Sequence, residues 1–290
     1  MCETESKNEI VTDEKGAVGT KDYFTPQKNK ASKELAELFG QSENQLKKEF
    51  GIYKAKKIYK KLSYFVDAKA KLREEVIKEL QNAKKRELYS VLVYPTQVSL
   101  AKLILKGTET KVRAVINFPS GEEFYKVTKN VISKVFLNGA DEVLIMISSY
   151  SILNDYAKDQ LKHIKKIIKR FKKRNIAIML DCTDLTAVDV ERGIKAIRFS
   201  GAQSVMLVNF KGSFDKGIIQ DSVLLLNGKA QLECFPKLIS LENAVALLLD
   251  GVSVLTLVNA LDIADELSKM VNLVGEDSEA LDKTNKEAYN

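Results

Sequence analysis

The feature that most restricts the fold is an alternation of short apolar segments with amphipathic ones, which runs from about residue 62 to residue 273. The short segments are continuous runs rich in β-branched residues, as in parallel strands that are covered by helices on both faces. The segments between them each have one apolar face, as helices packed on a sheet do. We predict eight strands, at Leu62–Val66, Ser90–Tyr94, Val112–Phe118, Glu142–Ile147, Ile176–Leu180, Ser204–Phe210, Ala230–Cys234 and Val254–Val258.

The intervening segments predict a helix after each strand. Gly139 and Gly201 each follow a predicted helix and precede a strand, as helix-terminating glycines do. Eight β/α units of this kind close into a (β/α)8 TIM barrel, an α/β fold. An open doubly wound sheet is the alternative, because counting repeats cannot prove closure. The helices are predicted at Ala70–Ala83, Val98–Lys106, Glu122–Leu137, Asp155–Arg174, Val188–Phe199, Lys216–Leu226, Leu241–Leu249 and Ile263–Val271.

The composition divides the chain into four parts. Residues 1–30 contain too few apolar side chains to offset the entropy of ordering, so we predict that they are disordered. Residues 31–60 form a helical extension, residues 61–273 form the barrel, and residues 274–290 form an acidic tail.

Several classes of protein are excluded by composition. No apolar run reaches the roughly 18 residues that span a bilayer, and the polar start lacks the pattern of a secretion signal. We therefore expect a cytoplasmic protein without a transmembrane segment. The cysteines Cys2, Cys182 and Cys234 lack metal-site spacing, and His163 is the one histidine. No metal and no cofactor are expected.

The net charge of +7 is concentrated in two basic segments, Lys47 to Lys61 and Lys162 to Arg174. Such segments attract nucleic acid or anionic lipid. No nucleic-acid motif accompanies them, so solvated helix faces are the favoured interpretation.

In β/α barrels, function lies at the carboxyl ends of the strands. The chain carries Val93-Tyr94-Pro95, then KVRAVINFPSG over Lys111–Gly121, then NGADEV over Asn138–Val143. With these motifs, the stretch from Val91 to Leu261, about 60% of the chain, resembles the deoxyribose-phosphate aldolase family. The resemblance implies a metal-free class I aldolase barrel, often a homodimer. Its reaction joins acetaldehyde to glyceraldehyde 3-phosphate through a lysine Schiff base, giving 2-deoxyribose 5-phosphate.

The resemblance also places the family's reactive residues on positions of different chemistry. The Schiff-base lysine falls on Met206, the second lysine on Glu233 and the proton-transferring aspartate on Leu144. A thioether forms no imine, a carboxylate would hold a nearby lysine protonated, and leucine transfers no proton. Pro236-Lys237 replaces the family's phosphate-binding glycine pair, and proline has no N–H to donate.

Other ionisable residues near the predicted barrel mouth are fallback candidates. Lys211 or Lys237 could hold a relocated Schiff base, although solvated loop lysines are the favoured interpretation. Asp181 with Asp184 could transfer protons or bind a cation. An N-cap for the helix that begins near Ala187 is the favoured interpretation of this pair.

Charge is costly inside an apolar strand, so Glu233 needs a specific environment. Either its side chain points outward toward a helix, or it pairs with a barrel cation such as Arg113.

These observations predict a non-catalytic aldolase-like barrel, a pseudoenzyme that acts through binding or assembly. Residues 31–61 are its predicted contact with a protein partner, and the resemblance implies a homodimer. The alternative is an active deoxyribose-phosphate aldolase-type lyase with a relocated lysine. In a third hypothesis, the basic segments bind nucleic acid or lipid.

Overall fold

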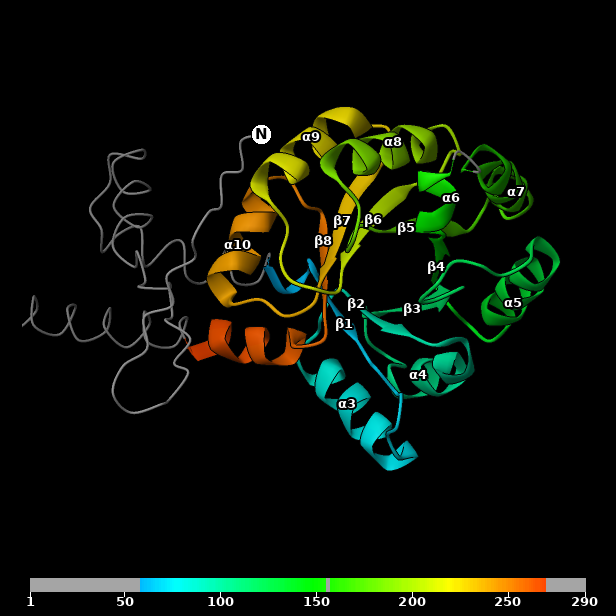
Figure 1. Cartoon of the computed structure of the whole chain (residues 1–290). Helices are drawn as coiled ribbons and strands as arrows, with labels where there is room; N and C mark the ends of the chain where they lie inside the picture. The colour runs from blue at the N-terminus through cyan, green and yellow to red at the C-terminus, as the bar shows by residue number, and fades with distance from the viewer. Residues whose placement is uncertain (1–57, 155–156, 270–290) are drawn as a thin grey trace, which may run out of the picture. The chain divides into compact units, whose positions relative to one another are not determined.

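The computed structural model describes residues 58–154 and 157–269. Within these ranges eight parallel strands pair in sequence order, and β1 also pairs with β8 (Figure 1). The predicted (β/α)8 barrel is confirmed, and the open doubly wound alternative is wrong. The predicted segment 1–30, the helical extension up to residue 57 and the tail 274–290 lie outside the described residues. The strands are β1 Leu62–Phe65, β2 Ser90–Val93, β3 Lys111–Ile116, β4 Glu142–Ile147, β5 Asn175–Asp181, β6 Ser204–Asn209, β7 Gln231–Pro236 and β8 Val254–Leu257.

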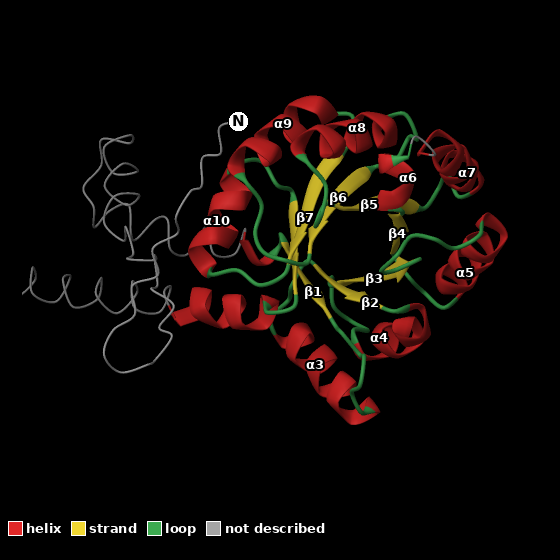
Figure 2. Ribbon diagram, in the orientation of Figure 1, coloured by secondary structure: helices red, strands yellow, loops and turns green. Residues whose placement is uncertain are grey.

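Helices surround the strands as a ring, which Figure 2 draws in red around the yellow barrel. The structure adds a short helix, α6, that the sequence did not predict, and a last helix covers residues 260–269. The helices are α3 Arg73–Lys85, the 3-10 turn η1 Pro95–Gln97, α4 Val98–Ile104, α5 Tyr125–Leu137, α6 Ser149–Leu153, α7 Ala157–Arg170, α8 Ala187–Arg198, α9 Lys216–Leu226 and α10 Leu241–Leu249. None of the described helices is long and apolar enough to cross a bilayer.

Side-chain caps determine where several helices begin. Thr186, Asp215 and Ser240 each accept hydrogen bonds from backbone N–H groups in the first turn of α8, α9 and α10. Gly139, at φ +100°, ends the turn after α5, as predicted. Leu72 lies within the helix predicted at Ala70–Ala83, but α3 begins one residue after it, and Leu72 is 69% exposed.

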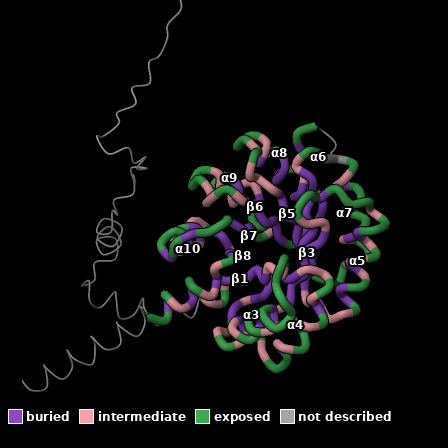
Figure 3. Tube along the Cα trace, turned by 60° about the horizontal axis from the view of Figure 1, so that its bottom comes forward, coloured by how far each residue is buried: buried purple, intermediate pink, exposed green. Residues whose placement is uncertain are grey.

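The barrel has two apolar cores, one between strands and helices and one inside the strands. In Figure 3 the strands are buried, and the outer faces of the helices are exposed. Ten buried residues form the inner core, and three aromatic residues pack against it. The buried ten are Phe65, Leu92, Val115, Leu144, Met146, Ala177, Met179, Met206, Val208 and Phe235, and the packed three are Tyr94, Phe118 and Phe210.

The strand register arranges the inner side chains in levels. Paired residues step along the axis from each strand to the next, so alternate strands supply the four side chains of each level. From the amino ends of the strands upward, the levels are Ser90, Glu142, Ser204 and Val254; then Ser63, Arg113, Ala177 and Glu233; then Leu92, Leu144, Met206 and Thr256; then Phe65, Val115, Met179 and Phe235; and finally Tyr94, Met146, Val208 and Val258.

Candidate functional site

The two lowest levels of the barrel interior contain a buried ionic cluster. Arg113 Nη2 donates to Glu233 Oε2 at 2.6 Å and to Glu142 Oε1 at 3.0 Å. Arg113 is completely buried, and Glu233 is 2% exposed. Of the two environments predicted for Glu233, pairing with Arg113 is therefore the one that the structure has. Burial, together with the nearby Glu142 carboxylate, raises the pKa of Glu233, and Arg113 offsets only part of that rise.

The next level holds two of the three positions at which the family resemblance places catalytic residues. Leu144 and Met206 are both completely buried inside the barrel. Glu233 lies beside Met206 in the strand register, one level below it along the axis. The structure thus brings Leu144, Met206 and Glu233 together, and all three are almost completely shielded from solvent.

Aromatic rings close the barrel above the Met206 level. Phe65 contacts Tyr94, Phe118 and Phe235, with ring centroids 5.7, 5.6 and 5.2 Å apart. Phe210 contacts Phe118 at 5.7 Å and Phe235 at 6.0 Å. Most of these pairs are edge-to-face, the arrangement that ring quadrupoles favour. We call these five residues, Phe65, Tyr94, Phe118, Phe210 and Phe235, the aromatic layer.

A cavity of about 890 Å³ opens at the carboxyl ends of the strands, and the aromatic layer lines it. The charged residues in its wall are Asp67, Lys69 and Lys237. Leu144, Met206 and Glu233 are not among its lining residues. The cavity is therefore mainly apolar and ends above the level of the family's reactive positions.

The loop between β3 and α5 carries Phe118 to this cavity and is held against the end of β4. A Cβ on Gly121 would lie 2.4 Å from the backbone of Ile147 and Ser148, so glycine allows a contact that other residues would block. The Gln160 amide of α7 joins the two segments. Its Nε2 donates to the Gly121 carbonyl at 2.9 Å, and its Oε1 accepts from Ser148 N at 3.2 Å.

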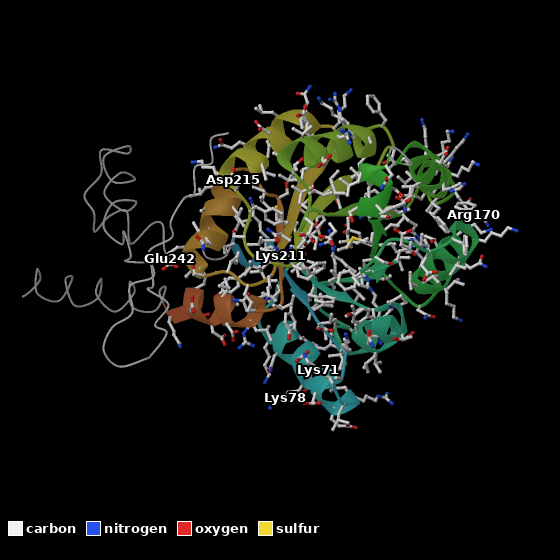
Figure 4. The ribbon with its side chains drawn as sticks, in the orientation of Figure 1. Lys71, Lys78, Arg170, Lys211, Asp215 and Glu242 are labelled. Atoms are coloured by element: carbon white, nitrogen blue, oxygen red, sulfur yellow. The ribbon has the colours of Figure 1, made fainter. Side chains whose placement is uncertain are left out.

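The fallback lysines differ in their surroundings. Lys211, labelled in Figure 4, is exposed and forms an ion pair with Asp184, which is also exposed. Lys237 is exposed and lines the cavity. Its backbone N–H donates to the Gly212 carbonyl at 3.3 Å, so that N–H is already engaged at the position where the resemblance places phosphate binding.

The predicted N-cap role of Asp181 and Asp184 is wrong. Thr186 caps α8, and Asp189 completes a capping box with it. Asp181 Oδ1 instead accepts hydrogen bonds from Thr183 N at 2.9 Å and Thr183 Oγ1 at 2.5 Å, which fixes the turn after β5. Thr186 directly precedes Ala187, the first residue of α8, so it occupies the N-cap position that Asp181 and Asp184 are too far back to reach.

Cys182, Cys234 and His163 do not line the cavity. Burial raises the pKa of Cys182 to about 12, so its thiol stays protonated at neutral pH, and Cys234 is buried. Part of the Cys182 residue remains accessible to solvent, unlike Cys234. His163 stacks on Tyr125, with ring centroids 5.1 Å apart. Within residues 58–154 and 157–269, no cluster of His, Cys, Asp and Glu has metal-site geometry.

Sequence reasoning missed the aromatic layer. The signal was a phenylalanine at the ends of three of the strands, in the phrases Asn117-Phe118-Pro119, Asn209-Phe210-Lys211 and Cys234-Phe235-Pro236. Recognising that the rings converge requires the strand register, because a shift of one residue would turn each ring outward.

A second surface feature is the basic segment of α7 and the turn after it. Lys162 to Arg174 contains eight lysines and arginines and no acidic residue, and all eight side chains are exposed. We call these eight the α7 basic surface: Lys162, Lys165, Lys166, Lys169, Arg170, Lys172, Lys173 and Arg174. Arg170 lies at the outer edge of the ring of helices in Figure 4.

Comparison with known proteins relates the chain to one group of enzymes. No protein-family model matches it. It is 28% identical over 153 residues to the deoxyribose-phosphate aldolase of Caldicellulosiruptor saccharolyticus, covering 50% of this chain and 70% of that protein. It is 32% identical over 148 residues to the Clostridium botulinum (strain Okra) enzyme, covering 50% and 66%. It is also 32% identical over 136 residues to the Streptococcus suis (strain 05ZYH33) enzyme, covering 46% of this chain and 60% of that protein. The matched segment thus spans 60 to 70% of the relatives' length.

Solved structures support the fold. The tetrameric deoxyribose-phosphate aldolase from Aeropyrum pernix superposes with a TM-score of 0.66 at 14% identity, covering 79% of this chain and 98% of that one. The aldolase QR15 superposes at 0.67 with 16% identity, covering 73% and 96%. An orotidine 5'-phosphate decarboxylase from Pyrococcus horikoshii also superposes, at 0.53, so the fold by itself does not specify a reaction. The chain is a sequence relative of the deoxyribose-phosphate aldolases, and it has the closed (β/α)8 barrel of their structures.

Proposed function

We propose that this protein is a non-catalytic relative of the deoxyribose-phosphate aldolases, which acts by binding at the barrel mouth and through assembly. The main support is that the barrel interior is filled where an aldolase needs a reachable amine. Leu144 and Met206 are completely buried beneath the aromatic layer. A class I aldolase requires an uncharged lysine that an aldehyde can reach.

Two further observations support the same proposal. Glu233, at the position that the resemblance assigns to a second lysine, is paired with Arg113 inside the barrel and is remote from the cavity wall. At the phosphate position, Pro236 has no N–H, and the N–H of Lys237 donates to Gly212. The groups that usually activate the amine and those that usually bind the phosphate are therefore both missing from these positions.

The test combines an activity assay with chemical trapping. The full chain is incubated with 2-deoxyribose 5-phosphate, and acetaldehyde release is measured against a Clostridium botulinum relative as positive control. In parallel, acetaldehyde and borohydride are added, and lysine adducts are sought by mass spectrometry. We expect no turnover and no site-specific adduct. Turnover that is lost on mutation of a single lysine would overturn the proposal.

The alternative is an aldehyde-lyase with a relocated Schiff-base lysine, and the positions of two lysines make it testable. Lys237 lines the cavity, whereas Lys211 is paired with Asp184 in an exposed loop. Borohydride trapping in the K237R and K211R variants separates them, because arginine keeps the charge but forms no imine. An adduct that disappears only in K237R would establish the alternative.

The assembly part of the proposal concerns residues 31–61 and self-association. Tyr59, at the end of this segment, donates from its hydroxyl to the Ala264 carbonyl at 2.8 Å. That bond joins Tyr59 to the last described helix. Light scattering on the eluting full chain measures its mass, and we expect a homodimer. A monomeric mass at micromolar concentration would remove self-association from the proposal.

The α7 basic surface supports a second candidate function, binding of nucleic acid through its phosphates. Its eight exposed cations exceed the whole chain's net charge of +7. A localised cluster of cations is what phosphate recognition requires. Titration of a fluorescent DNA duplex at increasing salt tests this candidate. Salt-independent binding, or binding to anionic vesicles alone, would contradict it.

A further inference from the structure

We propose that the barrel-mouth cavity binds a small aromatic carboxylate, or an equivalent ring-bearing anion, in place of a sugar phosphate. The inference rests on the proposed function, because it assigns a ligand class to the site that catalysis would otherwise use. Three properties of the cavity support it: its shape and surface, its charge, and what its wall cannot bind.

The wall of the cavity is mostly apolar and rich in rings. It contains the whole aromatic layer together with Pro95, Pro119, Leu238 and Val258. The rings of the layer contact one another edge to face, an arrangement that leaves ring faces available for a further ring. A cavity of about 890 Å³ is within the range of small-molecule sites. A planar apolar ligand therefore matches the floor of the cavity.

The charges on the rim favour an anion. Asp67 Oδ1 already accepts hydrogen bonds from the Tyr94 hydroxyl at 3.3 Å and from Lys69 N at 3.1 Å. Among the described residues, the ammonium groups of Lys69 and Lys237 have no ion-pair partner. Two unpaired cations against one hydrogen-bonded carboxylate leave a net positive rim above an apolar floor. A carboxylate at one end of the ligand would complement this rim.

The same wall disfavours a sugar phosphate. A polyol needs several hydrogen-bond partners when it leaves water, and an apolar wall offers few. Phosphate is usually held by unengaged backbone N–H groups. Pro236 has no such group, and the N–H of Lys237 is donated to Gly212. The cavity therefore lacks the groups that usually bind the sugar and those that usually bind the phosphate.

The experiment uses two probes with the same ring and opposite charge, 2-naphthoate and 2-naphthylmethylammonium. Calorimetry with the full chain measures the Kd of each. We expect one equivalent of naphthoate to bind more tightly than the cation. The K237E variant should weaken naphthoate at least tenfold, which corresponds to about 1.4 kcal/mol, and should improve the cation. K229E, which reverses an exposed lysine outside the cavity wall, is the matched control.

A second variant separates the cavity from unspecific apolar binding. V258W places a large ring in the cavity, and L249W adds the same ring at an exposed position at the end of α10. Circular dichroism verifies that both variants fold. V258W should abolish the binding of both probes, and L249W should leave it unchanged. Naphthoate binding that is absent, or that survives V258W, would overturn the inference.

This outcome is independent of the test of catalysis. Naphthoate has no aldehyde or ketone carbon for an imine, so its binding reports on the cavity alone. Aldolase turnover would overturn the non-catalytic proposal and leave the naphthoate result standing. Failure of naphthoate to bind, with no turnover, would overturn only the ligand assignment.

Discussion

At the residue scale, Glu233 shows how a carboxylate can occupy a strand position inside the barrel, where the family resemblance places a lysine. A buried carboxylate is tolerated there because Arg113 lies 2.6 Å away, yet the cluster holds two carboxylates for one guanidinium. Removing one partner of a buried ion pair usually costs about 3–5 kcal/mol, whereas a paired cluster is close to neutral in stability. Glu233 is therefore tolerated in the lower barrel as long as Arg113 is present, and losing either partner alone would destabilise it.

The raised pKa of Glu233 predicts a specific pH dependence. Burial favours the protonated carboxyl, so its stabilising contribution is fully present below the usual value of 4.5 and is lost as pH rises through the folded-state pKa. The unfolding free energy of the wild type minus that of E233Q should fall as pH rises from 4.5. Each tenfold decrease in the acid dissociation constant of Glu233 on folding adds about 1.4 kcal/mol to this fall.

Urea unfolding at a series of pH values measures this difference. E191Q, which removes an exposed carboxylate of α8, corrects for the general effect of one less negative charge. A difference that increases with pH would mean that Arg113 outweighs burial and lowers the pKa of Glu233.

Introducing a lysine at Met206 tests whether the packing around this position, and not only the residue type, prevents an aldehyde from forming an imine there. A lysine at 206 would be buried beneath the aromatic layer and beside Glu233. M206K should therefore lose about 3 kcal/mol or more of unfolding free energy and should give no borohydride adduct with acetaldehyde. M206L, which nearly conserves volume, should cost less than about 1.5 kcal/mol. A stable M206K that forms an adduct would show that the site is reachable after all.

At the scale of elements, the alternation of apolar runs and amphipathic segments predicted the eight strands and most of the helices. Strand boundaries differ by a few residues, since residue type changes gradually where a strand leaves the sheet. Helix α6 was not predicted because five residues are too few to show a helical period. The capping residue of α8 was misplaced, because both Asp and Thr can cap and sequence alone does not fix the length of the preceding turn.

The loop between β3 and α5 gives a prediction at this scale. G121A must place a Cβ 2.4 Å from the backbone at the end of β4 and also adopt φ +75°. G201A has a similar φ of +84° but no atom within 4 Å of the new Cβ. Positive φ alone costs roughly 1 kcal/mol, so G201A should lose about that amount, and G121A should lose about 2 kcal/mol more.

Urea unfolding of the two glycine variants measures the difference. Because the loop carries Phe118, G121A should also weaken naphthoate binding, and G201A should not. Equal losses of stability in the two variants would show that the loop is not packed against β4 as described.

At the scale of the whole molecule, the fold followed from the sequence more completely than the site did. Leu144, Met206 and Glu233, the positions that the family resemblance singles out, all lie inside the barrel, whereas the sequence had left the direction of the Glu233 side chain open. The aromatic layer depends on five side chains that meet across the axis: two from β1 and β7, two from the residues directly after β2 and β6, and one from the loop after β3. No local pattern encodes such a meeting, since it depends on strand order, register and closure together.

Charge distribution provides the last prediction, also at this scale. Neutralising three lysines of the α7 basic surface, K166Q/K169Q/K173Q, lowers the net charge as much as neutralising three exposed lysines elsewhere, K78Q/K106Q/K229Q. In Figure 4, Lys78, on α3, lies at the bottom of the view, away from Arg170 at the right-hand edge. If the α7 surface binds duplex phosphates, only the first variant should reduce the slope of log K against log salt, by about 2.7 for three lost contacts. Fluorescence anisotropy with a DNA duplex over a range of salt concentrations measures the slope. Equal effects in the two variants would mean that the net charge of the molecule, and not a site on α7, governs the attraction.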